Sequence, residues 1–188
     1  MAREQVKLKK GPAPVEIGKG VLVKNGARVA NDPWRVLADD EQAADGEHVV
    51  VPLARYLAEH EALSARGADR LGVVLEAADA AEELRGRLQG VALVMVRFPA
   101  FKDGRGFTTA RLLRERFGYA GELRAVGEVL EDQIFYMLRC GFDAFEIIAA
   151  DPEAAYTRAA RSFSIAYQAA ADRRKTIIVA RTRASDDT

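Results

Sequence analysis

The chain has few residues that bind metals and no apolar run long enough to cross a membrane. It contains 1 cysteine and 2 histidines among 188 residues. These numbers exclude an iron–sulfur cluster held by four thiolates and a structural zinc site of cysteines and histidines. No apolar run approaches the roughly 18–20 residues of a membrane span, and the N-terminus lacks the apolar core of a signal peptide. We therefore expect a cytoplasmic protein without a metal, a membrane segment or a disulfide.

The chain also lacks an excess of either charge. Its formal net charge is zero, which argues against a general nucleic-acid-binding protein. With 49% hydrophobic and 30% charged residues, it has the composition of an ordinary single domain that buries a core without crosslinks. We expect one α/β domain over residues 21–183, a flexible basic tail at 1–20 and a frayed C-terminal tail at 184–188.

The ordered part is expected to begin with a β-hairpin. Two short apolar runs, within residues 21–30, flank the dipeptide Asn25-Gly26. Asn-Gly readily adopts the positive φ angles of a type I′ turn, the tightest connection between antiparallel strands.

Strand and helix patterns then alternate. Apolar runs without polar alternation, such as residues 91–96, are typical of parallel strands covered on both faces. The expected strands are Val49–Pro52, Leu71–Glu76, Val91–Phe98, Leu123–Gly127 and Ala144–Ala149, with a further candidate at Thr176–Arg181. The expected helices are Leu53–Ala65, Ala80–Leu88, Thr108–Phe117, Glu131–Cys140 and Pro152–Ala171. The sequence therefore predicts a parallel βαβ sheet of about five strands, either open or curled into an incomplete TIM-like barrel.

Four of these apolar strands carry one charged residue each: Glu76, Arg97, Arg124 and Glu146. A buried parallel strand solvates such a side chain poorly, so we expect each charge to lie at a carboxyl end of a strand or to be paired. Ligands of open α/β sheets and of barrels bind at that same edge.

A basic, glycine-containing loop precedes the helix expected at Thr108. With Thr108 as N-cap, Arg111 occupies the third helical position, where its charge opposes the positive end of the helix dipole. Arg105 adds a like charge, and Gly104 and Gly106 permit close approach of a ligand to the backbone. One interpretation is an oxyanion site at the helix start. The other is a solvated loop in which Asp103 or Glu115 neutralises the arginines.

The predicted oxyanion site contains Asp103, Gly104, Arg105, Gly106, Thr108, Arg111, Arg124 and Gly127. Gly127 ends a strand in a run that is similar to the late strand-helix-strand unit of phosphate-binding TIM barrels. Gly104 and Gly106 also match part of the dinucleotide-binding fingerprint, but Thr109 stands where the third glycine belongs. We therefore expect no nucleotide cofactor, and no catalytic residue is assigned.

The stretch from Phe98 to Phe145 resembles an uncharacterised bacterial family, domain of unknown function 934, commonly labelled a probable oxidoreductase involved in sulfite reduction. The matching residues are Phe98, Pro99, Phe101, Asp103-Gly104-Arg105-Gly106, Ala110-Arg111-Leu112, Arg114, Gly118, Gly121, residues 123–127, Asp132-Gln133 and residues 139–145. The resemblance implies a role beside assimilatory sulfite reductase, because genes of this family tend to lie near those for sulfate assimilation. Arg97 departs from the pattern, since similar sequences usually carry an acidic residue there.

Two functions of different class remain. The first is a non-catalytic accessory or docking protein that contacts sulfite reductase or its electron donor through the basic edge of the sheet. The second is a small enzyme or carrier, with oxidoreductase activity as one option, that binds a sulfur oxyanion or a phosphorylated ligand through the basic loop. The sequence favours the first, because it offers several cations but no convincing general base or cofactor cradle.

Overall fold

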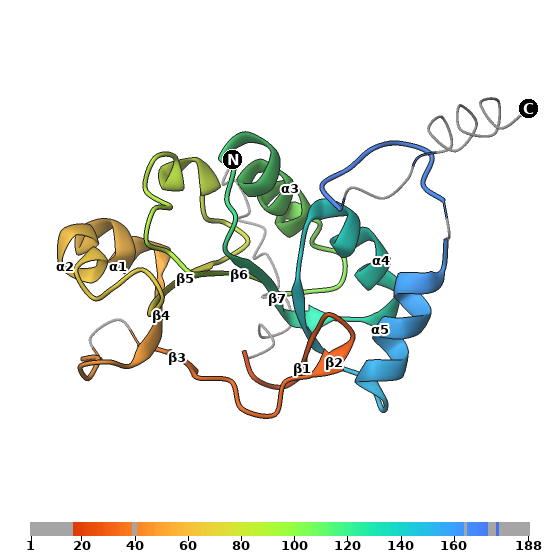
Figure 1. Cartoon of the computed structure of the whole chain (residues 1–188), viewed down its shortest axis with the longest axis horizontal. Helices are drawn as coiled ribbons and strands as arrows, with labels where there is room; N and C mark the ends of the chain where they lie inside the picture. Colours follow the sequence, from red (N-terminus) through yellow and green to blue (C-terminus); the bar gives the residue numbers. More distant parts are fainter. Residues whose placement is uncertain (1–16, 39–40, 164, 173–175, 177–188) are drawn as a thin grey trace, which may run out of the picture.

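The computed structural model describes residues 17–38, 41–163, 165–172 and 176, which form a mixed α/β fold (Figure 1). One sheet contains eight strands in the order β2-β1-β8-β7-β6-β5-β4-β3. The strands are β1 (Val21–Lys24), β2 (Ala27–Arg28), β3 (Trp34–Val36), β4 (His48–Pro52), β5 (Leu71–Leu75), β6 (Leu93–Phe98), β7 (Glu122–Val129) and β8 (Ala144–Ile147). The helices are α1 (Leu53–Ala58), α2 (His60–Ser64), the 3₁₀ turn η1 (Ala81–Leu84), α3 (Arg105–Arg111), the π-helical turn η2 (Leu112–Arg116), α4 (Glu131–Cys140) and α5 (Pro152–Arg161).

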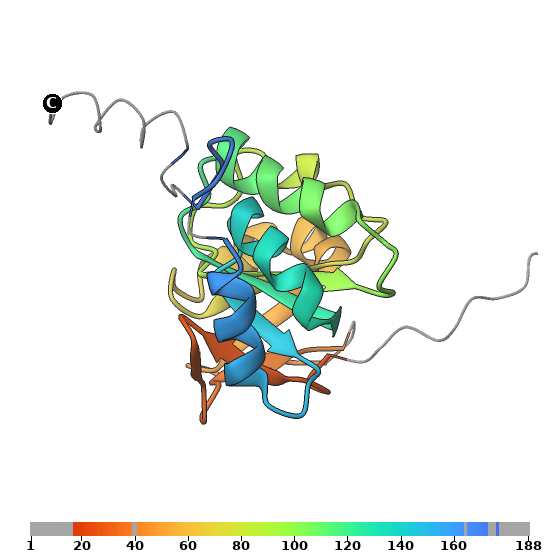
Figure 2. The same ribbon diagram turned by 90° about the vertical axis from the view of Figure 1, so that its right-hand side faces the viewer.

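The parallel part of the sheet follows the order of the chain. Strands β3 to β8 each pair in parallel with the next one, and the helices lie on the outer side of the curved sheet (Figure 1). Figure 2 shows α3, α4 and α5 following one another on this side. A sheet wound in one direction with all its helices outside is the beginning of a barrel. The fold is thus a curled half-barrel, the second of the two architectures that the sequence left open.

The hairpin at Asn25-Gly26 forms the edge of this sheet rather than a separate ribbon. Both turn residues have positive φ angles, 53° and 84°. Strand β1 pairs antiparallel with β2 on one side and with β8 on the other. The second strand of the hairpin has only two residues.

Several expected elements have different bounds in the structure. The sheet has six parallel strands rather than about five, because the three-residue strand β3 was not expected. The helix predicted at Ala80–Leu88 is a single 3₁₀ turn, and the one predicted at Pro152–Ala171 ends at Arg161. Of the strand predicted at Thr176–Arg181, only Thr176 is described, and it forms an isolated bridge with Ala166. Residues 1–16 and 184–188, parts of the two predicted tails, lie outside the described residues.

The sheet has an apolar cluster on each face. On the convex face, buried strand residues pack with Leu113, Ile134 and Met137 of the helices. On the concave face lie the buried residues Val50, Val74, Leu93, Met95 and Val126, with Ile17, Trp34 and Val36 against them. Because side chains alternate along a strand, Arg124 faces the concave side together with Val126, away from α3.

Candidate functional site

The N-cap of the helix after β6 lies four residues earlier than the sequence predicted. Gly104 is its N-cap and Arg105 its first residue, so Thr108 is not the N-cap and lies inside the helix. The reason is Asp103, whose Oδ1 accepts the backbone N–H of Arg105 at 3.2 Å. Aspartate commonly bonds the backbone two residues further on, and here this bond occupies an N–H at the helix start.

Asp103 also neutralises the guanidinium of Arg105. Two hydrogen bonds, of 2.9 and 2.6 Å, join the side chains. The pair lowers the pKa of Asp103 below its ordinary value and is exposed to solvent on the arginine side. The first cation of the predicted oxyanion site therefore has a carboxylate partner within its own loop.

Arg111 does not oppose the helix dipole. It is the seventh residue of α3, and the helix continues into the π turn η2, so its charge lies away from the first turn. Its guanidinium binds the carboxylate of Glu115, one turn further on, at 3.0 Å. The electrostatic conflict expected from the sequence is absent, because it depended on Thr108 being the cap.

Two of the predicted glycines are explained by contacts with Phe98. A Cβ atom on Gly106 would lie 2.6 Å from the Phe98 ring, and one on Gly127 would lie 2.5 Å from its carbonyl oxygen. Gly127 has a φ of 92° and lies where the register between β7 and β8 shifts. These residues let α3 and a β-bulge approach β6 closely. A Cβ atom on Gly104, by contrast, would come no closer than 3.8 Å to another residue, at the ring of Phe107.

Arg124 lies on the other face of the sheet from α3. Its side chain is only 2% exposed and forms ion pairs of 2.5 Å with Asp32 and 2.7 Å with Glu122. Burial by itself raises the pKa of Glu122, but Arg124 and Lys24 hold that pKa below its ordinary value. Arg124 therefore does not join Arg105 and Arg111 in one site.

Of the other charged residues of the strands, Arg97 and Glu76 form an ion pair, whereas Glu146 bonds a backbone N–H. Arg97 binds Glu76 at 3.0 Å across β6 and β5. Glu146 is nearly buried and accepts the backbone N–H of Gly18 at 2.8 Å. Burial raises the pKa of Glu146, although Gly18 and Arg124 act in the opposite direction.

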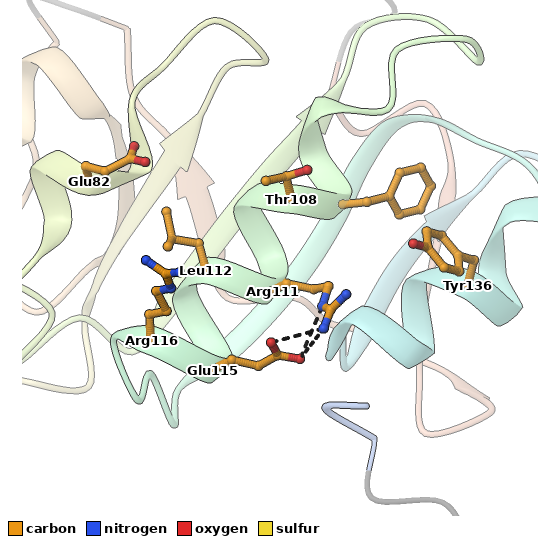
Figure 3. A pocket seen from close by; sticks show the side chains of 8 residues that line it. Glu82, Thr108, Arg111, Leu112, Glu115, Arg116 and Tyr136 are labelled. Atoms are coloured by element: carbon orange, nitrogen blue, oxygen red, sulfur yellow. Dashed lines mark hydrogen bonds and ion pairs between the residues drawn. The ribbon is translucent and has the colours of Figure 1, made fainter. Parts of the chain in front are cut away.

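Thr108 and Arg111 line a shallow groove of about 400 Å³ on the outside of the molecule (Figure 3). Glu115, Arg116 and Tyr136 line it as well. Figure 3 shows Arg111 turned toward Glu115, with Tyr136 on the neighbouring helix. The groove carries both signs of charge, and the described residues contain no group of side chains that could hold a metal ion.

Arg114, beside this groove, has a structural role that sequence reasoning missed. It donates hydrogen bonds to the carbonyls of Gly141, Tyr119 and Gly121 and to the carboxylate of Asp143. Its side chain is 15% exposed. The arginine thereby ties the chain before β7 to the chain before β8. The Arg-to-Asp spacing of 29 residues gives no local signal for this contact.

The segment after α5 carries three of the six large apolar side chains that are exposed among the described residues. Phe163, Ile165 and Tyr167 are 60%, 48% and 78% exposed, whereas Ala166 between them is buried. The ring of Phe163 packs on Phe135 of α4, with centroids 5.0 Å apart. The sequence prediction placed these residues inside a long helix. Their spacing of two residues, typical of an extended segment, was the signal that could have shown otherwise.

Comparison with known proteins identifies a family but no characterised relative. Residues 72–178 match the model of the family described as "Bacterial protein of unknown function (DUF934)". No curated protein matches the chain. Within the described residues, no helix has the length and apolar character that a membrane crossing requires. Since the match covers more than half of the sequence, the chain belongs to the DUF934 family.

Proposed function

We propose that the protein is a non-catalytic accessory protein that docks onto a component of assimilatory sulfite reduction, either sulfite reductase or its electron donor. The process is the one that the family resemblance implies. The observation that carries the docking role is the exposed apolar segment at Phe163, Ile165 and Tyr167. Contiguous exposed apolar side chains on a soluble domain are typical of a protein interaction surface.

The ion pairs of the three arginines in the predicted oxyanion site favour docking over the alternative. Arg105, Arg111 and Arg124 each have a carboxylate partner in the chain. An oxyanion would have to compete with these carboxylates for the guanidinium groups, which lowers the gain from binding. The alternative, a small oxyanion- or phosphate-binding enzyme or carrier, is supported by the groove that Thr108 and Arg111 line.

The test is a pull-down with the tagged full-length protein from cells growing on sulfate as sole sulfur source. We expect stoichiometric recovery of sulfite reductase or of its reductant. The double variant Ile165→Ser/Tyr167→Ser should lose this recovery. The variant Phe101→Ser/Ile148→Ser should keep it, because it removes one aromatic and one aliphatic side chain that are also exposed, 48% and 39%, but lie elsewhere. Recovery of neither protein by the wild type would contradict the proposal.

A further inference from the structure

The turn at Asn25-Gly26 is a chemically reactive feature that the docking function does not use. An asparagine loses its side-chain amide when the backbone nitrogen of the next residue attacks the side-chain carbonyl carbon. A side chain on that next residue hinders the attack, and glycine has none. The sequence contains two asparagines: Gly26 follows Asn25, whereas Asp32 follows Asn31. Asn25 is therefore the asparagine at which this reaction is favoured.

The structure leaves the two reacting groups of the turn without competing bonds. Asn25 is exposed, and among the described residues no hydrogen bond uses its side chain or the N–H of Gly26. This N–H can therefore lose its proton to solvent without breaking a bond of the fold. The attack also requires a rotation of the backbone between the two residues. Strand β2, directly after the turn, has two residues and both are exposed, so local opening of the turn uncovers little apolar surface and costs little.

Asn31 is also exposed, but an anchored residue follows it. The carboxylate of Asp32 binds the buried guanidinium of Arg124 at 2.5 Å. This ion pair holds the chain after Asn31 against the sheet and opposes the rotation that the attack requires. The side chain of Asp32 adds steric hindrance. Asn31 is thus a control within the same chain.

We propose that Asn25 deamidates in the folded protein and that its isoaspartyl product detaches β2 from β1. The nitrogen of Gly26 forms a bond to Cγ of Asn25, the bond from Cγ to Nδ2 breaks, and the proton of the Gly26 N–H leaves with the ammonia. Water then opens the resulting succinimide at one of its two carbonyl carbons, which gives aspartate or isoaspartate. The reaction consumes only water, and nothing is oxidised or reduced. In isoaspartate the main chain runs through Cβ and Cγ, so the turn gains one backbone atom.

The added atom does not fit a two-residue hairpin turn, whose geometry fixes the register of its strands. The pairing of β1 with β2 begins directly at this turn. The hydrogen bond from the N–H of Val29 to the carbonyl of Leu22, at 2.9 Å, depends on the same register. So does the bond from the N–H of Arg28 to Glu153 of α5, at 3.0 Å, where α5 lies beside the hairpin (Figure 2). Strand β1 stays paired with β8 over four residues, so the fold persists while the outer edge of β1 becomes open.

The test keeps the folded full-length protein at neutral pH over several weeks and cleaves samples on the carboxyl side of glutamate. The peptide 17–41 then contains both asparagines. Mass spectrometry with electron-transfer fragmentation distinguishes asparagine, aspartate and isoaspartate at each position. We expect Asn25 to lose its amide and Asn31 to keep it. The variant Asn25→Gly should show no conversion in this peptide, and it keeps the turn because glycine adopts a positive φ.

Hydrogen exchange followed by NMR tests the structural consequence. In the isoaspartyl form, isolated by hydrophobic-interaction chromatography, the amide of Val29 should lose its protection. The amides of β8 that pair with β1 should keep theirs. The variant Asn25→Asp carries the same new charge without the added backbone atom, and aspartate also tolerates a positive φ. Its Val29 amide should therefore stay protected.

Each part of the proposal has results that would overturn it. The site is wrong if Asn25 keeps its amide, if Asn31 loses its amide equally fast, or if Asn25 reacts only in the chain unfolded by urea. The detachment of β2 is wrong if Val29 stays protected in the isoaspartyl form. Loss of this protection in Asn25→Asp would show that the charge, and not the added atom, frees the strand, and would overturn that part as well.

Discussion

The basic stretch from Asp103 to Arg116 and the segment from Arg161 to Gln168 differ in whether the chain itself supplies partners for their side chains. In the first, Arg105 and Arg111 bind carboxylates two and four residues away. In the second, three large apolar side chains are about half exposed or more. A cluster of like charges is prominent in a sequence, but nearby opposite charges neutralise it at little cost. Exposed apolar side chains cannot be compensated by a neighbouring charge, because only burial removes them from water. For this reason we propose the segment from Arg161 to Gln168 as the interaction surface.

The largest expected effect tests whether the basic stretch is structural. Arg114→Met keeps the apolar stem but leaves three carbonyls without their donor, and it leaves Asp143 with only the backbone N–H of Leu123. We expect the free energy of unfolding to fall by about 1–3 kcal/mol, because the network is partly buried and Asp143 is 42% exposed. Arg116→Met is the control, because Arg116 is exposed two residues away, and it should change stability by less than about 0.5 kcal/mol. Urea denaturation measures both, and equal effects would remove the structural role of Arg114.

The next largest effect is a difference in stability between alanine substitutions at Gly106 and at Gly104. Gly106→Ala places a methyl group against the buried ring of Phe98, so we expect a loss of about 1–3 kcal/mol from overpacking. The methyl group of Gly104→Ala makes only an ordinary contact, 3.8 Å from the Phe107 ring, at a φ of −86°. This substitution should change stability by less than about 0.5 kcal/mol, since reduced freedom of the unfolded chain offsets the poorer N-cap. If Gly104→Ala is the more damaging change in thermal and urea unfolding, the packing explanation of Gly106 is wrong.

Local signals predicted much of the fold. The Asn25-Gly26 turn, the apolar run of β6 and the bounds of α4 follow from chemistry within a few residues. The left-handed Gly141 ends α4 as a C-cap, with a φ of 97°. Strand β3 was not predicted, because a strand of three residues is too short to show a recognisable hydrophobic pattern.

The candidate site was less predictable, because its outcome depends on contacts that sequence spacing does not encode. The N-cap was placed at Thr108 because a threonine side chain can cap a helix, whereas Asp103 caps from outside it. The partner of Arg124 is Asp32, 92 residues earlier in the chain. The end of α5 was missed because an apolar alternation was interpreted as the continuation of an amphipathic helix.

Two carboxylates on the concave face, Glu146 and Glu122, should give smaller effects: the pH dependence of stability that each contributes has the opposite sign. The pKa of Glu146 is raised in the folded protein by burial. The folded state therefore binds the proton more tightly than the unfolded chain, and stability declines as pH rises from the unfolded pKa to the folded one. Glu146→Gln removes this dependence. Its stability relative to wild type should increase between pH 4 and pH 7.

Glu122 provides the matched comparison. Its folded pKa is lowered, so its contribution is present above the unfolded pKa and is lost as pH falls through the folded one. Glu122→Gln should therefore be destabilising at pH 7 and less so at low pH. Urea unfolding of both variants across this range checks the signs. The same sign for both would show that burial does not dominate at Glu146, or that ion pairing does not dominate at Glu122.

The smallest effect concerns the basic loop and decides between the two functions. Because Asp103 and Glu115 already neutralise Arg105 and Arg111, an oxyanion gains little by binding there. We expect sulfate to raise the melting temperature of wild type and of Arg105→Gln/Arg111→Gln equally, at constant ionic strength. Sulfate also stabilises proteins by exclusion from their surfaces, and a chloride series measures the part of the shift that is not due to binding. A ligand that binds only the folded state stabilises it by mass action. A sulfate-dependent rise confined to the wild type would therefore establish an oxyanion site at α3 and favour the binding enzyme or carrier over the docking protein.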